Sequence, residues 1–155
     1  MGVRVTRRRA LARSGKIADI LQAHGQLDEA LKIRTDEELP VYERLGDVRS
    51  RAVTMAWIAN IHRARNDHES AVRVLREEVL PVYERLGDAH SLLRGRWQLG
   101  AILLERAGEG DRDEAARLLV LALADAQRLT LPEARRIEET MRQAGIESPS
   151  LEPAS

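Results

Sequence analysis

Leu39-Pro40-Val41-Tyr42-Glu43-Arg44-Leu45-Gly46-Asp47 returns unchanged as Leu80-Pro81-Val82-Tyr83-Glu84-Arg85-Leu86-Gly87-Asp88. Residue 39 corresponds to residue 80 and residue 47 to residue 88, so the two copies are offset by 41 residues. A long identical run at a fixed offset indicates a duplicated structural unit, and periods of about 20–50 residues are typical of repeat architectures. We therefore expect a chain built from stacked repeats.

The same offset aligns apolar and small residues upstream of this run. The aligned residues are Ile17, Ala18, Ile20, Ala23 and Ala30 in the first repeat and Ile58, Ala59, Ile61, Ala64 and Ala71 in the second. Thr6, Asp47 and Asp88 share the spacing, and each has a side-chain oxygen that can cap the start of a helix. These positions predict repeats at residues 6–46, 47–87 and 88–129.

Each repeat contains two apolar-periodic segments separated by a polar turn. The turns lie at 24–26, 65–67 and 108–111, where Gly25, Asn66 and Gly110 suit the left-handed residue that closes a helix. The predicted helices span residues 7–23, 28–45, 48–65, 68–86, 89–107 and 112–129. In the second repeat the apolar spacing runs through Pro81, which predicts a kinked but continuous helix rather than a break.

A seventh helix is predicted after the third repeat. Thr130-Leu131-Pro132-Glu133 has the pattern of a capping box with proline in the first turn. The predicted helix spans residues 131–144 and is closed by Gly145; Ala134, Ile137, Met141 and Ala144 form one narrow apolar stripe on it. A helix that is apolar on one side only suits the end of a repeat array, which it covers. We predict an all-α fold, an α-solenoid of three helix pairs with a capping helix, flanked by an arm at 1–5 and a flexible tail at 146–155.

With the repeats laid out, the chain resembles the tetratricopeptide repeat (TPR) family, whose pattern places a Leu-Gly/Ala pair, a large residue and Gly-x-x-x-x-Ala across two antiparallel helices. The residues that carry it are Ile17-Ala18, Leu21, Gly25 and Ala30; Ile58-Ala59, His62, Asn66 and Ala71; and Leu99-Gly100, Leu103, Gly110 and Ala115. The long period is similar to that of kinesin light chains and bacterial signalling proteins. The resemblance covers residues 6–144 and implies fold more strongly than partner.

The resemblance also implies where a partner sits. Family members bind extended peptides or helices along a concave face lined by the first helix of each repeat. The corresponding residues are Lys16, Asp19, Gln22, Trp57, Asn60, Arg63, Arg94, Trp97, Gln98, Ala101 and Glu105. The amide of Asn60 can both donate to and accept from a peptide backbone. Trp57 and Trp97 are either binding anchors or core residues, and Arg63 and Arg94 either meet an acidic ligand or face solvent.

Some family members clamp a terminal carboxylate with lysine and asparagine side chains. Here Gly15 stands at the first lysine position, Asp19 at its asparagine and Trp57 at the next asparagine. The clamp is absent, so binding to chaperone C-termini is not expected.

Composition narrows the class of protein. Formal net charge is zero, which argues against a general nucleic-acid binder, although Arg4, Arg7, Arg8, Arg9 and Arg13 form a basic start. No apolar run approaches the roughly 18 residues of a membrane span. Met1-Gly2 begins a short myristoylation-like pattern, which we set aside because Thr6 is already explained as a cap. The absence of cysteine suits a cytoplasmic protein, and 23 arginines against two lysines suggest a GC-rich bacterial genome.

No sequence feature indicates catalysis. The four histidines lack metal-ligand spacing, and no nucleophile motif or phosphate loop is present, so we expect no metal, no cofactor and no enzyme activity. The Glu37-Glu38 and Glu77-Glu78 pairs are interpreted as a solvated helix face. The sequence thus predicts a protein–protein interaction module that binds a peptide or helix of a partner. A homodimer paired through Leu11, Ile17 or Leu21, and a sensor segment of a larger signalling protein, remain alternatives.

Overall fold

The computed structural model describes residues 2–149, which form helices and turns without a strand. The elements are α1 (Gly2–Ala23), α2 (Leu27–Ile33), η1 (Arg34–Glu38), α3 (Leu39–Leu45), α4 (Val48–Ala64), α5 (His68–Val74), η2 (Leu75–Val79), α6 (Leu80–Leu86), α7 (Ala89–Arg106), α8 (Asp111–Arg128) and α9 (Glu133–Gln143). Since α2–η1–α3 and α5–η2–α6 are each continuous, these elements form the seven helices predicted from the sequence.

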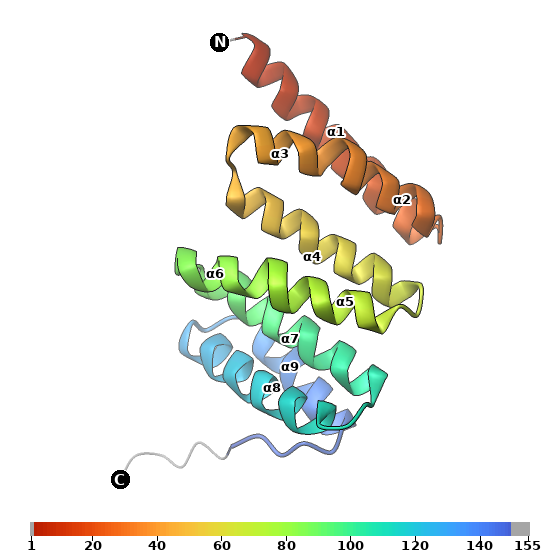
Figure 1. Cartoon of the computed structure of the whole chain (residues 1–155). Helices are drawn as coiled ribbons and strands as arrows, with labels where there is room; N and C mark the ends of the chain where they lie inside the picture. The colour runs from red at the N-terminus through yellow and green to blue at the C-terminus, as the bar shows by residue number, and fades with distance from the viewer. Residues whose placement is uncertain (1, 150–155) are drawn as a thin grey trace. The chain divides into compact units, whose positions relative to one another are not determined.

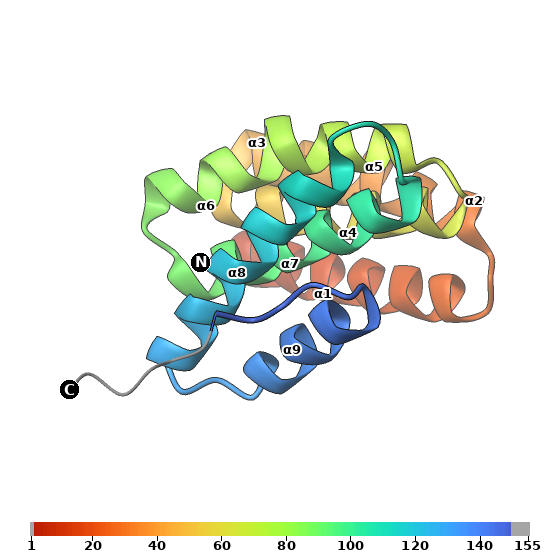
Figure 2. The same ribbon diagram turned by 90° about the horizontal axis from the view of Figure 1, so that it is seen from below.

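The chain divides into two compact units, Met1–Val82 (unit 1) and Tyr83–Ser155 (unit 2). In unit 1, α1 packs against α2 and η1, and α4 packs against α5 and η2 on one side and against the α2–η1–α3 helix on the other (Figure 1). In unit 2, α7 packs against α8, and α9 lies beside α8 after a short loop (Figure 2). Each unit therefore contains at least one pair of helices joined by a tight turn.

Both proline-containing helices continue through their prolines, which confirms the prediction for Pro81. A π-helical turn precedes each proline, Arg34–Glu38 before Pro40 and Leu75–Val79 before Pro81. Proline cannot donate a backbone hydrogen bond and its ring crowds the preceding turn, and a wider π turn relieves that crowding without ending the helix. As a result, residues on either side of the proline stay on one continuous helix.

Aspartates cap the first helices of the second and third repeats, as predicted. Asp47 Oδ1 accepts from Ser50 N at 3.0 Å, and Asp88 Oδ1 accepts from Ser91 N at 3.1 Å. Asp67 does the same at the start of α5, with Ser70 N at 3.1 Å. The backbone N–H of Ser50 is the main cause that lowers the pKa of Asp47.

Two predicted caps are wrong. Thr6 lies inside α1, which begins at Gly2, so residues 2–5 are helical rather than an arm. Its hydroxyl donates to the carbonyl of Gly2 at 2.8 Å, the back-bonding that threonine makes within a helix. Thr130 has φ +55° and caps nothing, because α9 begins only at Glu133. Residues 150–155 of the predicted tail lie outside the described range.

Small residues at the repeat positions allow the helices of a pair to approach closely. Ala18, Ala30, Ala59, Ala71 and Ala115 are fully buried. A Cβ placed on Gly100 would lie 3.0 Å from Leu119 Cγ, so a larger residue there would force the Leu119 side chain to shift. The first repeat differs from the second on its other face, because Ile17 and Ile20 are 45% and 58% exposed where the equivalent Ile58 and Ile61 are buried.

Candidate functional site

A cavity of about 310 Å³ lies between α1, the α2–η1–α3 helix and α4 in unit 1. Three of the predicted binding residues line it, Lys16 and Asp19 from α1 and Trp57 from α4. The other lining residues are Leu11, Ala12, Gly15, Arg34, Glu38, Tyr42, Arg49, Ser50, Val53 and Thr54. We call this space the unit 1 cavity.

A buried ionic cluster forms one wall of the unit 1 cavity. Arg34 and Glu38 are each only 3% exposed, and Arg34 Nη1 donates to Glu38 Oε2 at 3.1 Å and to Oε1 at 3.4 Å. Arg34 Nη2 reaches across to Asp19 Oδ1 at 2.5 Å, and the guanidinium lies 5.1 Å from the ring centre of Trp57. Thr54 Oγ1 donates to Glu38 Oε2 at 3.3 Å. The cluster therefore connects all three helices around the cavity.

The burial of Glu38 corrects the interpretation of Glu37-Glu38 as a solvated pair. Glu37 is exposed and accepts from Ser14 Oγ at 2.8 Å, but Glu38 points inward. The physical reason is helical spacing, because Glu38 follows Arg34 by four residues and so shares its inward face. Gly15 also makes room, since a Cβ at that position would lie 3.0 Å from Glu38 Oε1.

Burial raises the pKa values of two residues in this wall, Glu38 and Tyr42. It raises the pKa of Glu38 above the ordinary value, and the guanidinium of Arg34 opposes that shift. Burial also raises the pKa of Tyr42, with the negative charge of Glu38 acting in the same direction. Arg34 Nε is buried and donates to no described atom of the protein. The wall therefore contains a buried hydrogen-bond donor for which the described protein supplies no acceptor.

The other repeats fill the same positions with apolar side chains. The offset of 41 places Leu75 at the position of Arg34 and Val79 at that of Glu38, and both are fully buried against α4. In the third repeat, whose turn is about three residues longer, Leu119 and Leu123 take these places in the core of unit 2. A buried ion pair is often replaceable by apolar residues without loss of stability. The ionic cluster is therefore not a requirement of this helix-pair fold.

The space left by Gly15 is likewise specific to the first repeat. The equivalent residue is Ala56 in the second repeat and Trp97 in the third. Trp97 packs against the core of unit 2, its Nε1 donates to Thr140 Oγ1 at 3.0 Å, and Arg136 lies 5.0 Å from its ring centre. A large side chain thus occupies in unit 2 the position at which unit 1 has Gly15 beside the Glu38 carboxylate.

The remaining predicted residues are not part of the unit 1 cavity. Gln22, Asn60 and Arg63 lie on α1 and α4 of unit 1, half-buried and outside its lining. Arg94, Trp97, Gln98 and Glu105 lie on α7 of unit 2, of which Arg94 and Glu105 are exposed. Sequence reasoning missed Arg34, Glu38 and Tyr42. The sequence does contain a signal for Arg34 and Glu38, because the second repeat has the apolar residues Leu75 and Val79 at the corresponding positions.

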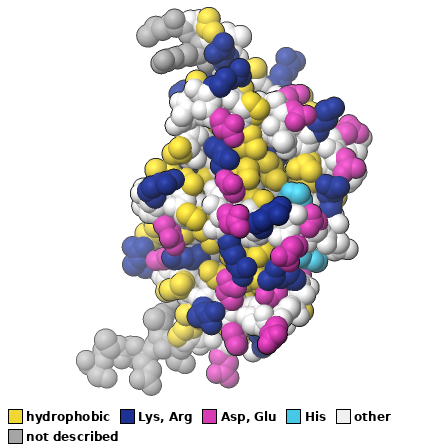
Figure 3. Space-filling model, viewed as in Figure 1, with side chains coloured by type: hydrophobic (Ala, Val, Ile, Leu, Met, Phe, Trp, Pro, Cys, Tyr) yellow, Lys and Arg dark blue, Asp and Glu magenta, His cyan; other side chains and the backbone are white. Residues whose placement is uncertain are grey.

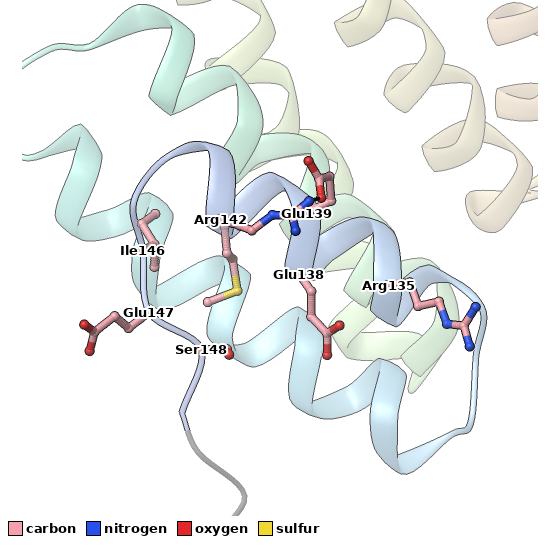
Figure 4. Close-up of a pocket in the computed structure, with 8 residues that line it drawn as sticks. Arg135, Glu138, Glu139, Arg142, Ile146, Glu147 and Ser148 are labelled. Atoms are coloured by element: carbon pink, nitrogen blue, oxygen red, sulfur yellow. Dashed lines mark ion pairs between the residues drawn. The ribbon is translucent and has the colours of Figure 1, made fainter.

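A second hollow lies at the C-terminal end of unit 2. It has a volume of about 750 Å³ and lies between α9 and residues 146–148. Figure 4 shows Arg142 beside Glu139, with which it forms an ion pair, and Glu138 and Arg135 further along α9. Charged side chains dominate this lining, and the ion pair between Arg142 and Glu139 is exposed to solvent, so the hollow has the character of an ordinary solvated surface.

The described residues show no metal-binding or membrane-spanning feature. Among residues 2–149, no three histidine, cysteine or acidic side chains group as metal ligands. Within the same range no helix combines the length and apolarity needed to cross a bilayer. On the side seen in Figure 3, basic and acidic side chains alternate over the surface.

Comparison with known proteins finds no matching family model, no matching curated protein and no matching solved structure. The TPR resemblance therefore stays an interpretation of the repeat pattern.

Proposed function

We propose that this protein is a non-catalytic interaction module of TPR-like helix pairs, which binds a peptide or helix of a partner protein at the unit 1 cavity. One observation carries the proposal. The first repeat has the ion pair of Arg34 and Glu38 in the wall of a cavity, at positions where the second and third repeats have buried apolar side chains. Since the apolar version packs well in the same chain, the polar version is best explained by a ligand.

The lining of the cavity suits a peptide. Trp57 is 39% exposed, and a partly exposed tryptophan beside a cavity is a typical anchor for an apolar side chain. Lys16 and Asp19 add one cationic and one anionic group at the rim. The Tyr42 hydroxyl can donate and accept, and the Ser50 hydroxyl, which donates to Asp47 Oδ2 at 2.8 Å, can accept. A volume of about 310 Å³ is at the lower end for a ligand site, which fits one or two side chains rather than a large cofactor.

The helices that form the cavity are held in place before any ligand arrives. Hydrogen bonds from Arg34 join α1 to η1, and the bond from Thr54 joins η1 to α4. A preformed site loses little conformational entropy on binding. The cysteine-free chain and its arginine bias lead us to place the protein in a bacterial cytoplasm.

Selection from a random-peptide display library tests the proposal. We expect wild-type protein to enrich peptides that share a motif, and these peptides to lose at least tenfold in affinity for Trp57→Ala and Lys16→Ala variants. Arg73→Ala, an exposed residue of α5 outside the cavity lining, is the matched control and should bind as wild type. Failure to enrich any motif, or equal binding by all three variants, would remove the cavity as the site.

A further inference from the structure

Unit 1 carries an exposed apolar face that the peptide site does not use. Ile17 and Ile20 are 45% and 58% exposed, and Val3 further along the same helix is 66% exposed. Val3, Ala10, Ile17 and Ile20 are separated by seven, seven and three residues, so they lie along one side of α1. Asp19 lies on a different side of α1, the side that lines the unit 1 cavity.

The internal repeat shows what this face is built to do. Ile17-Ala18, Ile20 and Ala23 recur as Ile58-Ala59, Ile61 and Ala64 on α4. On α4 the two isoleucines are only 5% and 0% exposed, and α4 packs between helices on both sides. An identical pattern that is buried in one repeat and exposed in the other indicates a surface made for a packed helix.

Charge selects a second copy of the chain as the occupant. The first seventeen residues of α1 contain Arg7, Arg8, Arg9, Arg13 and Lys16 and no acidic residue. The opposite end is acidic, because α2 follows after a short turn and has Asp28 and Glu29 in its first turn. Asp28 pairs with Arg65 at 3.2 Å, but its side chain is 84% exposed and such a surface pair contributes little.

We infer that two copies of this protein associate through antiparallel α1 helices, with the Ile17 and Ile20 side chains of the two copies in contact. In this orientation the basic half of each α1 lies beside the acidic end of the other copy. A parallel arrangement would place like charges together, which is unfavourable. Centred between residues 17 and 20, the two α1 helices overlap over residues 14–23, a length of about 15 Å. The interface is therefore smaller than a standard stable one, and we expect a reversible dimer at micromolar or higher concentration.

The molar mass of the whole chain, measured by sedimentation equilibrium over a range of concentrations, tests the inference. The mass should rise from 17.4 kDa toward twice that value for wild type and stay at 17.4 kDa for Ile20→Glu. Leu121→Glu is the matched control, since Leu121 of α8 is 49% exposed and carries no part of the proposed interface. A monomeric wild type at all concentrations, or a dimer that survives Ile20→Glu, would overturn the inference.

Cysteine cross-linking tests the antiparallel orientation of the two α1 helices. The sequence contains no native cysteine, so only the introduced cysteines can react. An antiparallel pair centred between residues 17 and 20 brings the two copies of residue 20 close together. It separates the two copies of residue 10 by about 25 Å at 1.5 Å per residue. A short bismaleimide should therefore link Ile20→Cys dimers and not Ala10→Cys dimers. Efficient linking of Ala10→Cys would contradict the antiparallel arrangement.

Discussion

Replacing Arg34 with leucine, alone and together with Glu38→Val, tests whether the ionic cluster is dispensable for folding. These are the residues that the second repeat has at the same positions, Leu75 and Val79, both fully buried. The single change removes the donors at 3.1 and 3.4 Å from Glu38 and leaves its carboxylate with the Thr54 hydroxyl at 3.3 Å. The double change removes the buried charges as a pair.

The magnitudes follow from what each variant leaves behind. Breaking a buried ion pair from one side costs about 3–5 kcal/mol, because the remaining charge has lost its partner. The second acidic partner of Arg34, Asp19, has a side chain that is 53% exposed, so water can stabilise its charge after the substitution. We therefore expect Arg34→Leu to lower the free energy of unfolding by about 3 kcal/mol, the lower end of that range. Replacing both partners by apolar residues is neutral or stabilising by about 1–4 kcal/mol. The free energy of unfolding of the double variant should therefore be within about 1 kcal/mol of the wild-type value, or higher than it.

Urea unfolding followed by the fluorescence of Trp57 measures these free energies in unit 1. A Trp97→Phe background leaves Trp57 as the only tryptophan, because the chain has two. The double variant should fold normally and bind the selected peptides at least tenfold more weakly. A double variant that is more than about 2 kcal/mol less stable than wild type would refute the reasoning, since the cluster would then be needed for the fold.

Three further predictions concern the surroundings of the cluster. Gly15→Ala should stabilise by about 1 kcal/mol in the Glu38→Val/Arg34→Leu background but not in wild type, because its Cβ would lie 3.0 Å from Glu38 Oε1; urea unfolding measures both. Asp47→Ala should cost about 1 kcal/mol through the lost cap, whereas Thr6→Ala should be within about 0.5 kcal/mol of neutral, and equal losses would contradict the assigned caps. Because the folded pKa of Glu38 is raised, the folded state keeps its proton to higher pH than the unfolded state. The stability of wild type relative to the double variant should therefore be highest below about pH 4 and fall as pH rises through the folded pKa, and a flat difference would contradict the buried, perturbed Glu38.

The repeat pattern predicted the helices well because its signals are local. Gly25 and Asn66 have positive φ just after the ends of α1 and α4, as predicted, and the continuous helix through Pro81 followed from apolar spacing alone. The prediction that Gly110 closes a helix is wrong, because Ala107 (φ +52°) ends α7 and Gly110 is the N-cap of α8. Predicted caps failed at Thr6 and Thr130, where residue type alone did not decide where the helix begins. Threonine is tolerated inside a helix when its hydroxyl bonds to the preceding turn, so its presence marks a boundary only weakly.

The site was predicted less completely, since it depends on contacts between helices. Lys16, Asp19 and Trp57 were placed by resemblance and do line one cavity. The recurrence of Glu37-Glu38 as Glu77-Glu78 predicts a solvated face for Glu38, whereas Glu38 is buried beside Arg34. Only the packing of η1 between α1 and α4 shows that both side chains point inward.

Site-specific photo-cross-linking most directly tests the central claim that the unit 1 cavity binds a partner. A photoreactive phenylalanine analogue at position 16, on the cavity rim, should yield a discrete adduct in a lysate of the source organism. An enriched peptide from the display selection should abolish that adduct by competition. The same analogue at position 73, on the exposed surface of α5, should yield none. Adducts at position 73 alone, or adducts at position 16 that the peptide does not compete, would contradict the account.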